Sequence, residues 1–219
     1  MSNGQGRMEE PARERERLIE TIGREVKNGR VLRAMAETPR ELFMPTRLRS
    51  RAYDNEAFAI GYGQTISQPL MVALMLDALD PAPGDVVLDV GAGSGYQAAL
   101  LSRLARRVVS VERVPQLAES ARERLAALPA ANAVVHHTPD ALGWPSEAPY
   151  DGIVVAASAP SAPPALLAQL REGGQLVIPL GPPHEQRLAV ITKTADGAGV
   201  RWLGACRFVP LLGAEGWGE

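Results

Sequence analysis

The chain has 219 residues, a formal net charge of −2 at pH 7 and 46% hydrophobic residues. This length suits one domain with a full core, and the near-balanced charge is typical of a soluble globular protein. The single cysteine, Cys206, excludes an internal disulfide framework, and no apolar run approaches the roughly 18 residues of a membrane span. Because the N-terminus is polar rather than signal-like, we expect a cytoplasmic protein that contacts no membrane.

Basic residues gather near the N-terminus, where residues 1–51 hold 12 Lys/Arg against 8 Asp/Glu. The charges there alternate in sign, as in Arg-Glu-Arg-Glu-Arg at 13–17. Such alternation indicates a solvated helix face more often than a binding surface, although an acidic partner for this segment stays open. We therefore expect no nucleic-acid partner.

The N-terminal third is predicted to be mainly helical. Residues 1–10 are expected to be disordered. Apolar residues then recur at helical spacing until Pro39 and Pro45 interrupt the pattern, which predicts two or three short helices. A loop with one short extended piece is expected at 54–69, followed by an apolar helix at 71–79.

From residue 81 onward, predicted strands and helices alternate as in βαβ units. The predicted strands are 86–90, 108–112, 133–137, 152–156, 175–180, 187–193 and 200–209, and the predicted helices are 97–106, 115–127 and 163–170. The last two strands follow one another directly, which predicts an antiparallel edge. We therefore expect one α/β domain over 11–219, with a helical segment and loop at 11–80 and a doubly wound, mostly parallel, seven-stranded Rossmann-like core at 81–219.

The first strand of this core ends in a carboxylate followed by three glycines, Asp89, Gly91, Gly93 and Gly95. A glycine turn between a strand and a helix aims backbone N–H groups at a ligand. Such a turn can also be only a tight connection. However, burying the Asp89 carboxylate without a partner would cost free energy, which favours a ligand site. A dinucleotide fingerprint needs its third glycine at the sixth position, which is Tyr96 here. The spacing instead resembles the first motif of class I methyltransferases that use S-adenosylmethionine.

Two further carboxylates follow the next strands. Glu112 ends the second strand, where a carboxylate reaches the ribose hydroxyls in a βαβ unit, although it could be an exposed strand-end residue. Asp140 comes after the third strand, where it could accept a hydrogen bond from the adenine amino group or simply serve the turn after Pro139. These positions support S-adenosylmethionine as the cofactor.

The histidines, the cysteine and Ser67 do not form a predicted metal site or catalytic triad. His136 and His137 are adjacent on a strand, point to opposite faces and have no acidic or cysteine partner at ligand spacing, so we expect no metal. Cys206 fits core packing. Ser67 precedes a helix, as N-caps do, and has no base that would complete a triad. Methyl transfer to a carboxylate needs no base, because the acceptor is already ionised at neutral pH.

Segments spread over 31–211 resemble protein-L-isoaspartate O-methyltransferases. The two most specific segments are Gly-Gln-Thr-Ile-Ser-Gln-Pro at 63–69 and Arg-Phe-Val-Pro-Leu at 207–211. Less specific matches are Pro-Arg-Glu-Leu-Phe at 39–43, the glycine motif within 88–97, Ser-Val-Glu-Arg at 110–113 and the Gly-Gly-containing strand at 173–181.

The resemblance implies methylation of the α-carboxylate of L-isoaspartyl residues in damaged proteins and peptides. The ester then collapses to a succinimide, which hydrolyses partly to normal aspartate and so repairs the chain. Ser67 matches the active-site serine, expected to hold the acceptor carboxylate. The expected substrate-binding residues are Gln64, Thr65, Ile66, Val209 and Leu211, and the expected cofactor-binding residues are Asp89, Gly91, Gly93, Gly95, Glu112, Asp140 and Ala141. We expect a monomer, with isoaspartyl proteins and peptides as its partners.

The chain departs from the usual family pattern at Ala59, Leu70, Pro139 and Ala156, mostly on the substrate side, which bears on acceptor preference. A first rival is methylation of an aspartate side chain in a dedicated peptide, disfavoured because no long C-terminal recognition extension is present. A metal-dependent catechol-type enzyme would need acidic ligands near Ala156, and an adenine amino-methyltransferase would need an Asn-Pro-Pro-aromatic run. The non-enzymatic rival, a cofactor-binding module without turnover, is disfavoured by the retained Gln-Thr-Ile-Ser loop.

Overall fold

The computed structural model describes residues 5–128 and 132–218, which contain one seven-stranded sheet in the order β5-β4-β3-β6-β7-β8-β9. The strands are β3 (Val86–Val90), β4 (Arg107–Glu112), β5 (Ala133–His137), β6 (Tyr150–Val155), β7 (Leu170–Leu180), β8 (Gln186–Thr194) and β9 (Gly197–Cys206). Strands β5, β4, β3, β6 and β7 are parallel, while β7–β8 and β8–β9 pair antiparallel. The predicted doubly wound sheet with an antiparallel C-terminal edge is confirmed.

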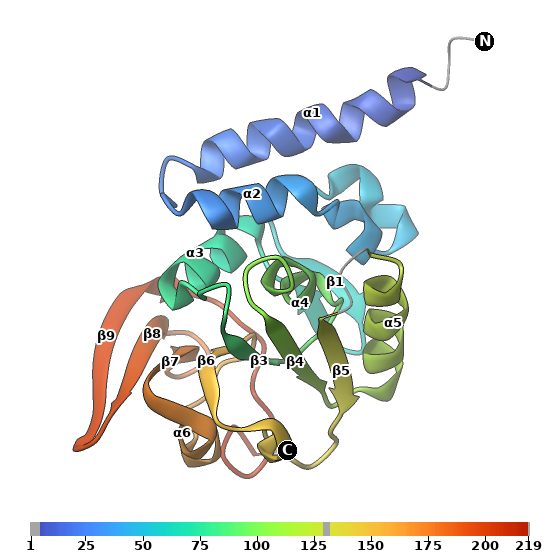
Figure 1. The fold of residues 1–219 in the computed structure, drawn as a ribbon. Helices are drawn as coiled ribbons and strands as arrows, with labels where there is room; N and C mark the ends of the chain where they lie inside the picture. The colour runs from blue at the N-terminus through green and yellow to red at the C-terminus, as the bar shows by residue number, and fades with distance from the viewer. Residues whose placement is uncertain (1–4, 129–131, 219) are drawn as a thin grey trace.

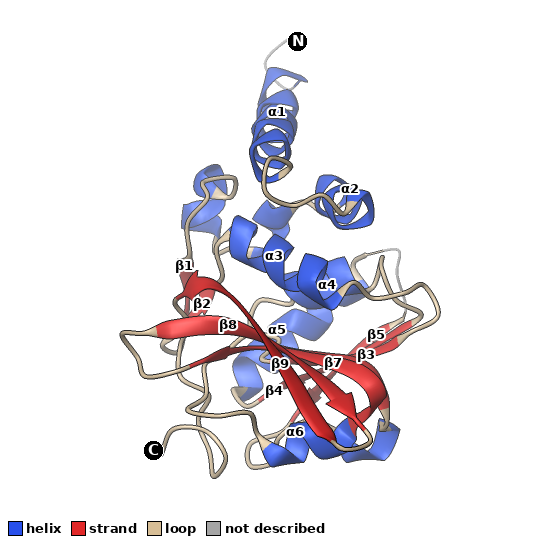
Figure 2. Cartoon of the chain, turned by 90° about the vertical axis from the view of Figure 1, so that its left-hand side faces the viewer, coloured by secondary structure: helices blue, strands red, loops and turns tan. Residues whose placement is uncertain are grey.

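Helices cover both faces of the sheet, as Figure 2 shows for α3 and α4 on one side and α6 on the other. The helices of the α/β core are α3 (Pro69–Leu79), α4 (Tyr96–Leu101), α5 (Pro115–Ala126) and α6 (Pro164–Gln169). Side chains alternate between the faces, so Val87 and Val108 enter one core while Leu88 and Val109 enter the other. Because both faces are buried, these strands are almost continuously apolar.

The N-terminal segment forms a separate helical layer above α3 and α4 (Figure 1). It consists of α1 (Gln5–Ile22), α2 (Gly29–Glu37) and the 3₁₀ helices η1 (Arg40–Phe43) and η2 (Thr46–Arg51). Helix α1 starts inside the segment 1–10 that was expected to be disordered, since its Gln, Arg, Met and Glu residues are good helix formers. Residues 1–4 lie outside the described part of the chain.

Polar contacts at two places fasten α2 and the residue that follows it, Thr38, to the core. Arg30 Nη2 donates to Asp80 Oδ1 at 2.7 Å, after the end of α3. Arg103, after α4, donates from Nη1 to Glu37 Oε2 at 2.8 Å and from Nε to Thr38 Oγ1 at 3.0 Å. The N-terminal layer is therefore held against α3, which follows the hairpin at 58–66, and α4, which follows the glycine turn at 91–95.

Several element boundaries differ from the prediction for local reasons. The 54–69 loop holds two strands, β1 (Phe58–Gly61) and β2 (Gln64–Ile66), paired as an antiparallel hairpin rather than one extended piece. Strand β7 already starts at Leu170, because Gly173, with φ +74°, lies within the strand instead of ending a helix. Strand β9 ends at Cys206, before the predicted boundary at 209.

The length of the helices and the burial of the single cysteine complete the description of the fold. No helix within the described ranges has both the length and the apolar character needed to cross a membrane. Cys206 is half-buried in the structure, and burial raises the pKa of its thiol to about 11.

Candidate active site

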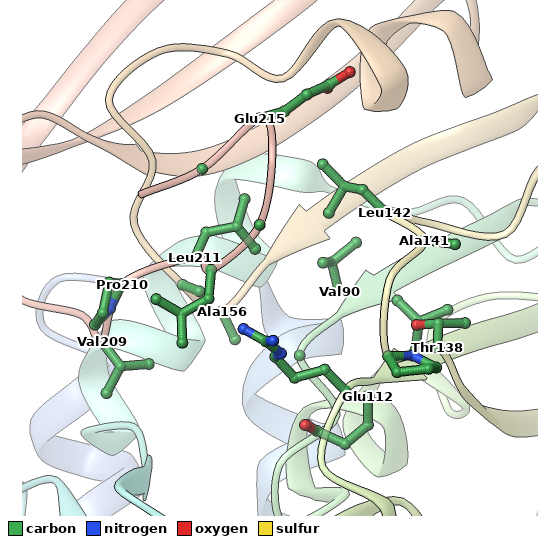
Figure 3. A pocket seen from close by; sticks show the side chains of 18 of the residues that line it. Val90, Glu112, Thr138, Ala141, Leu142, Ala156, Val209, Pro210, Leu211 and Glu215 are labelled. Carbon is green, nitrogen blue, oxygen red and sulfur yellow. The ribbon is translucent and has the colours of Figure 1, made fainter. Parts of the chain in front are cut away.

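A cavity of about 710 Å³ opens at the carboxyl ends of β3, β4 and β6. The sheet order reverses here, since β4 lies on one side of β3 and β6 on the other, and ligands of open α/β sheets bind at such switch points. Figure 3 shows Glu112 and Thr138 on one side of the cavity and Val209 and Leu211 on the other. The cavity thus spans the predicted cofactor and substrate segments.

The glycine turn between β3 and α4 adopts backbone conformations that favour glycine. Gly91, Gly93 and Gly95 have φ values of +91°, +52° and +86°. A Cβ on Gly95 would lie 3.3 Å from Ala121 Cβ, so this glycine also lets α4 approach α5. Gly91 and Gly93 line the cavity and keep its floor free of side chains.

Glu112 lies in the cavity with both carboxylate oxygens engaged, so it is no exposed strand-end residue. Oε2 accepts from the Gly93 N–H at 2.8 Å and Oε1 accepts from the Val114 N–H at 2.9 Å. Each carboxylate oxygen has a second lone pair, so Glu112 can still accept from two hydroxyl groups of a ribose. The hydrogen bond to Gly93 also ties this carboxylate to the glycine turn.

Asp89, expected at the cofactor, is fully buried and is not among the residues that line the cavity. Its carboxylate accepts from Gln97 Nε2 at 2.8 Å and from Ser110 Oγ at 2.6 Å. Burial raises its pKa to about 6, although both hydrogen bonds act in the opposite direction. Asp89 therefore has protein partners, and its hydrogen bonds join the end of β3 to α4 and β4.

Asp140 and Ala141 line the far end of the cavity in the loop after β5. Gln169, which the sequence did not single out, holds this loop. Its Oε1 accepts from the Trp144 N–H at 2.7 Å, and its Nε2 donates to the Leu142 carbonyl at 3.0 Å. The side chain is 5% exposed. Local sequence carries no signal for this contact, because Gln169 lies on α6.

The expected substrate residues divide into two groups. Gln64, Thr65, Val209 and Leu211 line the cavity. Ile66 is buried in the core, and Ser67 is half-buried next to the lining residues of β2 without being one of them. The N-cap of α3 is Gln68, so Ser67 does not cap this helix.

The C-terminal segment, which sequence analysis considered only as far as Leu211, forms an outer wall of the cavity. Residues 212–216 line it together with Leu211. The Leu211 N–H donates to the Ser158 carbonyl at 2.7 Å, and the Trp217 indole N–H donates to the same carbonyl at 2.9 Å. Glu215 Oε2 accepts from the Ala165 N–H at 2.8 Å. The segment is thereby fixed to the loop after β6 and to α6.

The fold and the cavity place the chain among the class I, Rossmann-like methyltransferases. The family model described as protein-L-isoaspartate(D-aspartate) O-methyltransferase matches residues 13–216. The chain is 47% identical over 209 residues to a protein-L-isoaspartate O-methyltransferase of Pelotomaculum thermopropionicum, covering 94% of this chain and 91% of that protein. The chain belongs to the protein-L-isoaspartate(D-aspartate) O-methyltransferase family.

Solved structures of proteins with this family's name have the same fold. A protein-L-isoaspartate O-methyltransferase superposes with a TM-score of 0.79 at 27% identity over 89% of this chain, which spans 65% of that longer chain. A Plasmodium falciparum protein given the same enzyme name, solved in complex with S-adenosyl-L-homocysteine, superposes with a TM-score of 0.77 at 28% identity, covering 89% of this chain and 96% of that one.

Proposed function

We propose that the protein transfers the methyl group of S-adenosylmethionine to the α-carboxylate of L-isoaspartyl residues in damaged proteins and peptides, which starts their repair through a succinimide. The observation that carries the proposal is the continuous cavity that runs from Glu112 to Gln64, Thr65 and Leu211. It joins a nucleoside-binding carboxylate to the segments that resemble the family's acceptor loop. Family membership supports the acceptor chemistry.

The residues present fit this cofactor. Gly91 and Gly93 leave the cavity floor free of side chains, and Glu112 keeps lone pairs free for a ribose diol. Asp140 would accept from the adenine amino group, and the Ala141 N–H would donate to the ring. When bound, S-adenosylmethionine supplies an electrophilic methyl group on its sulfonium. Asp89 acts through Gln97 and Ser110, and so supports the glycine turn rather than the ligand.

On the acceptor side, the protein needs to align an ion rather than create one. A carboxylate is ionised at neutral pH, so no residue has to remove a proton. We propose that the Ser67 hydroxyl donates to the acceptor carboxylate, while Gln64, Thr65, Val209 and Leu211 hold the substrate backbone and exclude water. Such alignment is the main contribution left to the protein in this reaction.

We further propose a division of labour along the chain, with residues 11–80 supplying the acceptor loop and residues 81–219 supplying the cofactor core. Gln64 and Thr65 come from the first part, and Glu112 and Asp140 from the second. The protein would work as a cytoplasmic monomer without a nucleic-acid partner. The half-buried free thiol of Cys206 is compatible with a reducing compartment.

The test is a methyl-transfer assay on two peptides of identical sequence, one with isoaspartate and one with aspartate. We expect methylation of the isoaspartyl peptide alone, and transfer to the aspartyl peptide or to neither would move the acceptor elsewhere. Ser67→Ala should lower turnover about tenfold, the value of one hydrogen bond to a charged group, with the cofactor Kd unchanged. Ser50→Ala, at an exposed site in η2, is the matched control. An equal loss of cofactor affinity in Ser67→Ala would contradict the acceptor role.

A further inference from the structure

Arg40, the first residue of η1, is a fully buried cation, and no carboxylate in the described part of the chain forms an ion pair with it. Its Nη2 donates to the Ser67 carbonyl at 2.9 Å, and its guanidinium carbon lies 5.0 Å from the centroid of the Tyr96 ring. Within residues 5–128 and 132–218, Nε and Nη1 have no hydrogen-bond partner. Burial lowers the pKa of Arg40 to about 10, so the side chain is still charged at neutral pH.

This arrangement is unfavourable for folding. A buried guanidinium loses its hydration, and one carbonyl and one aromatic face replace only part of it. Replacing buried charged groups by apolar residues of similar volume is often neutral or stabilising by about 1–4 kcal/mol. Stability alone therefore does not account for an arginine at position 40.

The partners of Arg40 directly follow two segments that line the cavity, β2 and the glycine turn. Ser67 lies in the acceptor loop, directly after β2. Tyr96 is the first residue of α4, directly after Gly95 of the cofactor turn. The Phe43 ring meets the Tyr96 ring edge-on, with centroids 5.5 Å apart, and so holds η1 against the same helix. One side chain thus touches both the loop that receives the acceptor and the turn that receives the cofactor.

We propose that Arg40 is a positioning residue for methyl transfer, which ties the acceptor loop at Ser67 to the cofactor turn at Tyr96. The inference rests on the proposed function. Transfer requires the acceptor oxygen and the methyl group to be aligned, and displacement by about 1 Å can lower the rate by a factor of about 100. Arg40 acts on this alignment through the main chain of Ser67, and its charge and hydrogen bond fix that main chain without touching the substrate.

The experiment compares Arg40→Met with Arg40→Lys and with Arg103→Met. Arg103→Met is the matched control, since Arg103 also fastens the N-terminal layer but contacts Glu37 and Thr38 instead of Ser67. For each variant, kcat is measured at saturating isoaspartyl peptide and cofactor, cofactor Kd by calorimetry, and unfolding by denaturant. The wild-type protein is assayed first, because absence of transfer there would refute the proposed function and not the role of Arg40.

Arg40→Met should lower kcat about tenfold or more, in line with the loss of a hydrogen bond from a charged group. Its cofactor Kd should stay within about twofold, and its midpoint of unfolding should be unchanged or higher. Arg40→Lys, which keeps the charge and places its donors on a single nitrogen, should recover part of kcat. Arg103→Met should keep the wild-type kcat. A parallel fall in midpoint, cofactor affinity and kcat would assign Arg40 a structural role and overturn the proposal. A change in the peptide KM alone would overturn it too, by showing attraction of the acceptor instead of alignment.

Discussion

The proposed cofactor half and the proposed acceptor half of the site are built from different kinds of contact. In the cofactor half, the buried carboxylates Asp89 and Glu112 each accept two hydrogen bonds from groups of the glycine turn or neighbouring elements. In the acceptor half, Ser67 is held by a buried arginine, two of whose donor atoms find no partner among the residues that the structure describes. The first half is formed mainly by one strand-turn-helix unit and the end of the next strand, whereas the second depends on segments far apart in the chain.

This difference indicates how the two halves respond to change. A carboxylate with two protein donors is fixed before a ligand arrives, so the cofactor half is preorganised. The acceptor half relies on η1, β2 and the segment after β9 packing together, so small displacements there alter alignment without altering cofactor binding. Mutations that separate cofactor affinity from turnover test this comparison directly.

The largest effect is expected from Glu112→Ala. It removes the proposed ribose acceptor and leaves the Gly93 and Val114 N–H groups without their partners. A loss of about 2–3 kcal/mol, or about 30- to 150-fold in cofactor Kd, should follow. The peptide KM at saturating cofactor should change little. Calorimetry measures the affinity, with Glu119→Ala on the exposed side of α5 as control. Wild-type affinity in Glu112→Ala would remove this residue from the ribose site.

A somewhat smaller effect is expected from Asp89→Asn, and it should depend on pH. Burial raises the pKa of Asp89 to about 6 in the folded protein, from the ordinary value of 3.8 for an exposed aspartate. Because the folded state binds the proton more tightly, this group's contribution to stability is present below pH 4 and is lost as the pH rises through 6. The free energy of unfolding of the variant, relative to wild type, should therefore increase by about 2 kcal/mol between pH 4.5 and 7.5. Denaturant unfolding at the two pH values checks this, and an identical pH dependence of both proteins would contradict the assigned ionisation.

The smallest effects are expected from a matched pair, Gln169→Leu and Gln186→Leu. Gln169 holds the loop at Leu142 and Trp144 in the cofactor half. Gln186 makes the same kind of clamp on the acceptor half, since it donates to the Phe208 carbonyl at 3.1 Å and accepts from the Phe208 N–H at 2.6 Å.

Each substitution leaves main-chain groups unpaired, at a cost of about 1 kcal/mol, so an effect of about fivefold is expected. Gln169→Leu should raise the cofactor Kd with little change in the peptide KM, and Gln186→Leu should do the reverse. Calorimetry and steady-state kinetics on both variants provide the measurement. If both variants weakened the binding of the same ligand, the division of the cavity into two halves would be wrong.

The same division explains what the sequence could predict. Strands β3 and β5 were predicted with their observed bounds. Glu112 lines the cavity, and the sequence could point to it because its distance from the glycines reflects one local βαβ unit. Arg40 was not singled out as buried, since its partner Ser67 is 27 residues away and helical periodicity does not encode that contact.

The contacts of Gln169 and Gln186 could not be predicted either, because their partners are also far away in the sequence. Gln169 and Gln186 lie 25 and 22 residues from the main-chain groups that they hold. The Phe208 clamp also explains why β9 ends at Cys206, because the Phe208 main chain pairs with a side chain instead of a neighbouring strand. Strand β7 was predicted too short because the glycines at 173 and 174 suggested a helix end, whereas the structure accommodates them within the strand.

The protonated state of Cys206 has a consequence for durability. Thiolates, not thiols, react with peroxides and electrophiles, and a pKa of about 11 leaves almost no thiolate at neutral pH. As Cys206 is the only cysteine of the chain, the protein has no thiol that is readily oxidised at neutral pH. The one thiol of this enzyme is therefore a poor target for the oxidants and electrophiles that modify thiolates.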